Sequence, residues 1–141
     1  MYSMDDSVTI DRLLASTNLA VLATVGNGAP YCHLMVIAAS DDRTQIIFIT
    51  RRESAKHRQI TEIPRISMLV DDRCRQGINS ASALTITGTA AEVFAGERQK
   101  ALEIYLKGHP ELTRFANRPD QAVFRITVDR LELNHFDRGS V

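Results

Sequence analysis

The chain contains the stretch Ile46-Ile-Phe-Ile-Thr50-Arg51-Arg52-Glu53-Ser54-Ala55-Lys56-His57-Arg58-Gln59-Ile60, followed shortly by Pro64-Arg-Ile-Ser-Met-Leu-Val70. An apolar run typical of a β-strand ends at Thr50, a basic loop follows, and the pattern predicts a helix that begins at Ser54. The first N–H groups of a helix are unpaired and carry the positive end of the helix dipole, so they bind anions. This order of elements predicts an anion-binding site between the strand and the helix.

Basic side chains are concentrated in this stretch. Residues 51–58 contain four Lys or Arg side chains and a single acidic one, Glu53, which gives a net charge of +3 before His57 is counted. The whole chain, in contrast, has 17 basic and 17 acidic residues and no net charge. An alternative interpretation is a solvated, charged loop in which Ser54 is an ordinary helix N-cap. The stretch alone leaves both interpretations open.

Length and composition predict one globular domain that spans residues 1–141. Of these residues 44% are hydrophobic and 24% are charged, and a chain of this length can bury a core of its own. The balanced charge argues against binding to nucleic acid or to an acidic membrane, because both favour a positive field. No apolar run approaches the roughly 20 residues of a membrane span, and the N-terminus lacks a signal-peptide pattern. We therefore expect a cytoplasmic protein.

The cysteines and histidines do not form a metal-binding pattern. Cys32 and Cys74 lack CxxC spacing and lie in or beside apolar strand candidates, so we expect buried, free thiols. The four histidines are scattered along the chain, at His33, His57, His109 and His135. No Ser-His-Asp, Cys-His or paired-carboxylate set stands out either. We therefore predict no metal site and assign no catalytic residue.

Six strand-like runs, separated by turn residues, dominate the rest of the chain. They cover residues 18–25, 31–39, 45–50, 65–70, 83–94 and 121–136. Gly26-Asn-Gly-Ala-Pro30 predicts a hairpin between the first two, and Gly88 predicts a bulge or bend in the fifth. The order of the runs predicts an antiparallel meander or a small barrel.

Helices are secondary in this pattern. Residues 8–16 and 96–106 have apolar side chains at helical spacing and predict amphipathic helices that cap a barrel end. Residues 71–82 lack periodicity and predict an exposed loop. Tyr105, His109 and Phe115 could form a lid over a pocket; alternatively, the two aromatic residues pack a helix onto the barrel and His109 caps a turn.

This layout resembles the FMN-binding split-barrel family, which includes pyridoxamine 5′-phosphate oxidase. The resemblance covers nearly the whole chain and depends on the order and spacing of several motifs. These are Ala23-Thr-Val-Gly-Asn-Gly-Ala-Pro-Tyr31, Phe48-Ile-Thr50, Ser54-Ala-Lys56, Gln59-Ile, Pro64-Arg-Ile-Ser-Met-Leu-Val70 and Leu84-Thr-Ile-Thr-Gly88-Thr-Ala90. It implies a mainly β fold, a six-stranded antiparallel split β-barrel with a few peripheral helices.

The resemblance also implies a cofactor, FMN, and residues that would hold it. One group would contact the phosphate and the ribityl chain, and one strand would run along the flavin ring. The first group is Ile49, Thr50, Arg51, Ser54 and Lys56, and the strand is His33, Leu34, Met35 and Val36. Family members form dimers with two flavin sites at the interface, which implies a homodimer here.

The expected function is that of an FMN-binding flavoprotein, an oxidoreductase with an unidentified small-molecule substrate. His33 stands where the oxidase has an arginine and Ala55 where it has a basic residue, so pyridoxine-phosphate oxidation is not expected. Alternatives are a flavin-storage, electron-carrier or redox-sensing module without turnover, and a relative that binds haem or a deazaflavin. Haem would need an axial ligand such as His33 or His135. A local hydrogen bond within the strand is an alternative role for His33.

Overall fold

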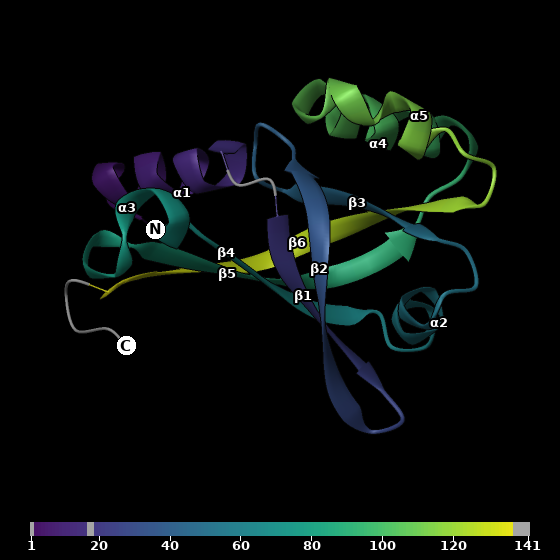
Figure 1. Ribbon diagram of the computed structural model, residues 1–141, viewed down its shortest axis with the longest axis horizontal. Coiled ribbons are helices and arrows are strands. Elements are labelled where there is room, and N and C mark those ends of the chain that lie inside the picture. The colour runs from purple at the N-terminus through teal and green to yellow at the C-terminus, as the bar shows by residue number, and fades with distance from the viewer. Residues whose placement is uncertain (1, 17–18, 137–141) are drawn as a thin grey trace.

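The computed structural model describes residues 2–16 and 19–136, and its six antiparallel strands form a closed barrel, as predicted (Figure 1). The strands are β1 Leu19–Gly26, β2 Ala29–Ala39, β3 Gln45–Arg51, β4 Arg65–Asp71, β5 Ser82–Glu92 and β6 Gln121–His135. The helices are α1 Met4–Ser16, α2 Ala55–Glu62, α3 Arg73–Gln76, α4 Ala95–Gly108 and α5 Thr113–Ala116, with the short 3-10 turns η1 Ile78–Ser80 and η2 Pro110–Leu112. The fold is therefore mainly β, with helices around the barrel.

The strand order is β1-β2-β3-β6-β5-β4, so the sequence neighbours β3 and β4 are not paired. β3 pairs instead with β6, and β4 pairs with both β1 and β5. The barrel interpretation is confirmed, and a simple meander is wrong. The connection that contains α2 carries the chain from β3 to β4, and this crossover allows the sheet to close.

The β1–β2 hairpin is formed as predicted. Its strands pair from Leu19 with Val36 down to Gly26 with Ala29. The turn residues Asn27 and Gly28 have φ values of 52° and 75°, which Asn and Gly adopt readily and which suit a tight hairpin. The predicted first residue of this strand, at position 18, lies outside the described residues.

Gly88 marks a bulge in β5, again as predicted. The register between β5 and β6 shifts between Thr87 and Gly88. A Cβ atom at Gly88 would overlap the backbone carbonyl oxygen of Thr127, which cannot move away without breaking the sheet. Glycine is therefore required where these two strands approach most closely.

The barrel interior is a packed apolar core. Its largest members include Phe48 and Phe124, whose rings stack with centroids 5.2 Å apart. Ile10 and Leu13 of α1 join this core, so α1 covers the barrel as expected. Tyr105 of α4 instead belongs to a second cluster, with the outward-facing side chains of β3 and β6. The expectation that α4 caps a barrel end is therefore corrected: it packs on the side wall.

Residues 73–80 are exposed, as predicted, but they form the short helix α3 and the turn η1 rather than a loop, and the buried carboxylate of Asp72 anchors the segment. Asp72 is 3% exposed, and its Oδ2 accepts a hydrogen bond of 2.8 Å from Arg12 of α1. Its Oδ1 accepts another, of 2.7 Å, from the backbone N–H of Ser82. The segment forms α3 and η1 around this anchor.

Cys32 and Cys74 are free thiols, as predicted, but both are exposed, so the expectation of burial was wrong. Cys32 lies in the exposed first half of β2, and Cys74 lies on α3, none of whose residues is buried. Among residues 2–16 and 19–136, no group of three or more His, Cys, Asp or Glu could hold a metal ion. None of the helices in those ranges is long and apolar enough to cross a membrane.

Candidate functional site

A cavity of about 560 Å³ lies where β2, β3, the start of α2 and the segment from α4 to β6 meet. Strands β2 and β3 contribute Leu34, Met35, Val36, Ile49, Thr50 and Arg51, and the start of α2 contributes Ser54 and Lys56. The opposite wall consists of Tyr105, Leu112, Phe115, Arg118, Asp120 and Gln121. The structure thus brings eight of the nine sequence-predicted cofactor residues into one cavity; His33 is the exception.

The end of β3 and the start of α2 are built as the sequence predicted. Thr50 is 5% exposed, and its Oγ1 lies 3.4 Å from Oγ of Ser54. Ser54 is the N-cap of α2, and its side chain accepts a hydrogen bond of 3.1 Å from the backbone N–H of His57. Between them, Glu53 has a positive φ of 66°, a conformation that turns the chain sharply into the helix.

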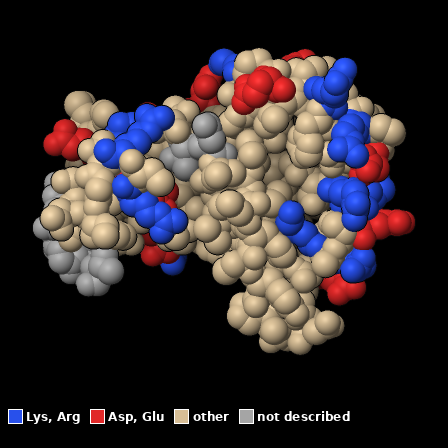
Figure 2. All heavy atoms as spheres, in the orientation of Figure 1, with Lys and Arg blue, Asp and Glu red and all other residues tan. Residues whose placement is uncertain are grey.

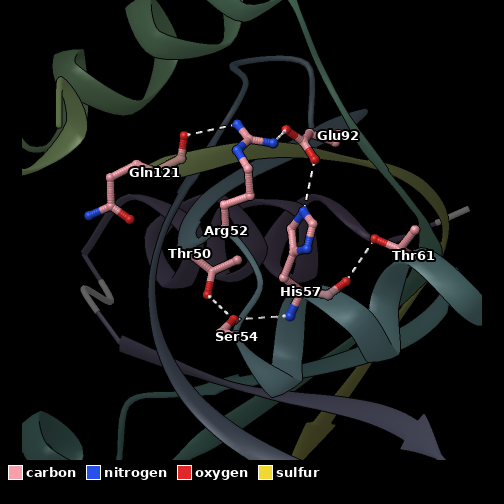
Figure 3. A network of polar contacts seen from close by, with 7 residues as sticks. All are labelled: Thr50, Arg52, Ser54, His57, Thr61, Glu92 and Gln121. Atoms are coloured by element: carbon pink, nitrogen blue, oxygen red, sulfur yellow. Dashed lines mark hydrogen bonds and ion pairs between the residues drawn. The ribbon is translucent and has the colours of Figure 1, made fainter. Parts of the chain in front are cut away.

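Two of the basic side chains in this segment are turned away from the cavity by a carboxylate (Figure 3). Glu92, at the end of β5, accepts hydrogen bonds from the Arg52 guanidinium and from Nε2 of His57, the latter at 2.9 Å. Burial raises the pKa of Glu92, but the hydrogen bonds from His57 and Arg52 outweigh it and hold the pKa below its usual value. Arg52 and His57 are therefore committed to Glu92.

Arg52 also fixes the loop to the start of β6. Its backbone N–H donates a 2.8 Å hydrogen bond to the carbonyl of Asp120, and its Nη2 donates a 3.4 Å bond to the carbonyl of Gln121. The two walls of the cavity are thus joined behind the ligand-facing surface.

Arg51 and Lys56 are the basic side chains left to face the cavity. Neither has a hydrogen-bond or ion-pair partner among the residues that the structure describes. Lys56 is half-buried, and this burial lowers its pKa from the usual value because the charged form loses hydration. An unpaired, partly buried ammonium beside a helix N-terminus favours an anionic ligand.

The charge on the surface matches this arrangement. Figure 2 shows charged side chains gathered around α2, whereas the face over β1 and β2 carries few of them. That face presents a row of aliphatic side chains, because Val21 of β1 lies opposite Leu34 of β2 and Leu69 of β4. Leu34 is 66% exposed and also lines the cavity, so the apolar row reaches the cavity mouth.

His33 faces away from the cavity. Its Nε2 lies 3.1 Å from Oγ1 of Thr24 and 3.2 Å from Oε1 of Gln59, which is on α2. Because side chains alternate along a strand, His33 points to the side opposite its neighbour Leu34. The structure therefore favours the interpretation of His33 as a local hydrogen-bonding residue.

Of the aromatic residues considered as a lid or as packing, Tyr105 packs a helix onto the barrel, whereas Phe115 lies in the cavity wall. Tyr105 is 1% exposed and packs α4 onto the barrel, while burial, with a smaller effect from Glu111, raises the pKa of its phenol to about 12. Phe115 is 37% exposed and lines the cavity. His109 caps the end of α4, as one alternative predicted, and its Nε2 lies 2.7 Å from the carbonyl oxygen of Ile37.

No local sequence pattern predicted the part of the cavity wall formed by Arg118, Asp120 and Gln121. Gln121 is 4% exposed and lies opposite Arg51 in the β3–β6 ladder. Among the described residues, its Oε1 is the one buried side-chain nitrogen or oxygen atom that has no hydrogen-bond partner. Only the pairing of two strands that are far apart in sequence brings this amide to the predicted anion site.

Comparison with known proteins gives the family. The family model described as pyridoxamine 5′-phosphate oxidase matches residues 8–135, which is most of the chain. A curated relative, the pyridoxine/pyridoxamine 5′-phosphate oxidase of Pseudomonas paraeruginosa (strain DSM 24068 / PA7), is 40% identical over 65 residues. The alignment covers 45% of this chain and 30% of that enzyme, so it spans less than a third of the relative's length.

Solved structures share the fold at low sequence identity. A heme binding protein from Mycobacterium smegmatis has a TM-score of 0.76 at 19% identity, over 88% of this chain and 52% of that one. A FAD-binding protein from Mesorhizobium loti has a TM-score of 0.73 at 16% identity, over 95% of both chains. These likenesses show the fold, and the family model, which matches residues 8–135, shows the family. The chain therefore belongs to the pyridoxamine 5′-phosphate oxidase family.

Proposed function

We propose that this protein binds FMN in the 560 Å³ cavity and acts as a flavin-dependent oxidoreductase on a small molecule. The observation that carries the proposal is the group of cationic side chains in the cavity wall. There Arg51 and the half-buried Lys56 lack partners in the described chain, and both lie beside the N-cap of α2. A phosphate group would neutralise both cations and accept hydrogen bonds from the helix N-terminus and from Ser54.

The rest of the cavity suits the remainder of the cofactor. Met35, Ile49 and Tyr105 are nearly fully buried and form apolar walls that would exclude water from a flat ring. In this proposal the backbone of residues 34–36 in β2 hydrogen-bonds the polar edge of that ring. A bound flavin supplies hydride or electron transfer, while the protein binds and orients it.

The cavity lining favours a flavin over haem as the ligand. Among the residues that the structure describes, no histidine lines it. His33 and His109 make hydrogen bonds elsewhere, and His135 lies 2.9 Å from Ser82 and 3.2 Å from Asp6. A haem would therefore lack the imidazole ligand that the sequence suggested for it. Ligands with a phosphate group fit the cations at Arg51 and Lys56 better.

A flavin carrier or redox sensor without turnover is the second candidate. Asp120 is the one carboxylate in the described lining, and the Tyr105 phenol, with its pKa near 12, is a poor acid or base near neutral pH. The lining therefore contains no paired acid and base. Photoreduction followed by reoxidation with candidate acceptors separates the two functions, because an enzyme gives saturable dependence on its substrate.

A homodimer is part of the proposal. The aliphatic row of Leu34, Val21 and Leu69 lies on an almost uncharged face and would be covered by a second copy. Burial of such a row stabilises an association by roughly 25 cal/mol for each Å² of apolar surface removed from water. Because Leu34 lines the cavity as well, the second copy would lie close to the flavin.

The test of FMN binding is a titration of the purified protein, followed by flavin fluorescence and visible absorbance. Replacement of Arg51 and Lys56 by alanine should weaken FMN binding at least tenfold. Arg58→Ala is the matched control, because Arg58 belongs to the same basic segment but donates to the Glu53 carbonyl and does not line the cavity. A wild-type protein that fails to bind added FMN would contradict the proposal.

A further inference from the structure

Gln121 is buried in the cavity wall, and its amide oxygen is an unpaired hydrogen-bond acceptor in the described part of the chain. The residue is 4% exposed, and Oε1 has no hydrogen-bond partner among the residues that the structure describes. Buried acceptors in native proteins are nearly always paired, since an unpaired one loses its hydration and gains nothing in return. The exception at Gln121 therefore calls for a donor that is not part of the described chain.

Two hydrogen bonds fix the backbone of Gln121, and one long hydrogen bond orients its side chain. The backbone N–H of Gln121 donates to the carbonyl of Arg118 at 3.2 Å, and its own carbonyl accepts from Arg52. The side-chain Nε2 donates to the carbonyl of Phe115 at 3.4 Å, which leaves Oε1 as the free acceptor. In Figure 3 the amide extends away from the Arg52–Glu92 pair. Gln121 thus lines the cavity and retains one amide oxygen that could accept a hydrogen bond if a small movement of the side chain exposes it to a ligand.

The position of Gln121 indicates which part of a ligand it would meet. Gln121 is the register partner of Arg51, the last residue of β3, and both residues line the cavity with Ser54 and Lys56. A ligand whose phosphate is held by those cations would place the atoms next to the phosphate near the start of β6. In FMN these atoms belong to the ribityl chain, whose hydroxyl groups are hydrogen-bond donors.

We propose that Gln121 is a specificity-determining residue whose Oε1 accepts a hydrogen bond from a hydroxyl group of the polyol chain that joins the phosphate to the ring. The inference rests on the proposed FMN site and adds to it the selection of a phosphorylated polyol. A ligand with the same phosphate but no such hydroxyl leaves the buried acceptor unpaired. That ligand therefore binds more weakly.

The test compares four ligands in wild type and in Gln121→Met, which keeps the side-chain length and removes the acceptor. We expect the dissociation constants of FMN and of riboflavin, which has the chain without the phosphate, to rise about three- to tenfold. Binding of lumiflavin, which has the ring without the chain, and competition by inorganic phosphate should stay unchanged. Gln76→Met is the control, since Gln76 is exposed on α3.

Thermal unfolding of the ligand-free proteins separates this role from a structural one. Gln121→Met should unfold at a temperature close to that of wild type, because it removes a buried acceptor that has no partner together with a single long hydrogen bond, the one of 3.4 Å from Nε2 to the Phe115 carbonyl. Gln121→Asn is the second variant, and it keeps an amide on a shorter side chain. It should weaken the binding of FMN and riboflavin and leave the binding of lumiflavin and inorganic phosphate unchanged. Unchanged FMN affinity in both variants, or an equal loss for all four ligands, would overturn the inference. Failure of wild type to bind FMN would overturn the proposed function as well.

Discussion

The Ser54 Oγ lies 3.4 Å from the Thr50 Oγ1, so one hydroxyl group links the end of β3 to the N-cap of α2. The same oxygen accepts a hydrogen bond from the backbone N–H of His57. Ser54 therefore combines two roles, because it stabilises the helix and would also contact a bound phosphate. Substitutions that separate these roles give the first prediction.

Ser54→Asp should preserve the fold and abolish flavin binding. Aspartate caps helices about as well as serine, so the free energy of unfolding should stay close to that of wild type. Its carboxylate would repel a phosphate at the anion site, and FMN affinity should fall more than tenfold. Ser54→Ala is the complement: it should lose about 1 kcal/mol of stability through the missing cap. Urea unfolding and FMN titration on the same samples measure both effects, and tight FMN binding by Ser54→Asp would argue against a phosphate at this site.

The affinity for FMN should decrease at high pH through Lys56. Burial lowers the pKa of Lys56 below 10.5, so in the ligand-free protein this side chain loses its proton at a lower pH than an exposed lysine. The phosphate favours the protonated form, so the dissociation constant should rise as pH increases through that pKa. In Lys56→Arg the guanidinium stays charged, and this rise should disappear. The ratio of the two dissociation constants, measured from pH 7 upward, should be constant if Lys56 does not contact the phosphate.

Glu92→Gln should destabilise the protein near neutral pH by about 1 kcal/mol, because two partly buried donors lose their charged acceptor. The pKa of Glu92 lies below 4.5 in the folded protein, so its carboxylate stabilises the fold fully above that pH. The contribution is lost as pH falls through the folded pKa, and the difference from wild type should then shrink. Glu97→Gln is a suitable control, because Glu97 pairs with Arg125 on the exposed surface. If the difference in the free energy of unfolding between wild type and Glu92→Gln is the same at pH 7 and at pH 3, the Glu92 carboxylate does not stabilise the fold in this way.

Leu69→Asp should convert the expected dimer into a monomer. Leu69 is 39% exposed at the end of the aliphatic row and does not line the 560 Å³ cavity, so the variant should affect association more directly than contacts in the cavity. A buried carboxylate at an apolar interface is strongly unfavourable. Sedimentation velocity gives the mass, and Val8→Asp on the exposed face of α1 is the control. A monomeric wild-type protein would refute the predicted homodimer.

Local patterns predicted the elements that are stabilised by near neighbours in sequence. The Asn27-Gly28 turn specifies its hairpin through backbone conformation alone, and the Ser54 cap specifies where α2 begins. Gly88 was recognised as a bulge because glycine is uncommon within strands. The local patterns did not indicate which side of these elements faces a cavity. The resemblance to the family supplied that information, because it implied the cofactor residues.

Features that depend on distant pairing could not be predicted. Asp72 is buried where Arg12, from a helix 60 residues earlier in the chain, meets its carboxylate. Gln121 reaches the cavity because β6 pairs with β3 rather than with a sequence neighbour. The direction of His33 depends on α2 lying against the hairpin, where Gln59 meets its ring. In each case the two partners are too far apart in the sequence for a local pattern to contain both of them.

The strand order also has a consequence for how the protein folds. The β1–β2 hairpin needs only a short loop to close, whereas the β3–β6 pairing joins Gln45 to Thr127 across most of the chain and has a larger entropic cost. We expect the β3–β6 pairing to form late. Arg51 and Gln121 are partners in this pairing, so the cavity that they line should be absent from folding intermediates that contain only the hairpin. A bound flavin would then stabilise the closed barrel selectively and slow its unfolding. Flavin release would report the separation of β3 from β6.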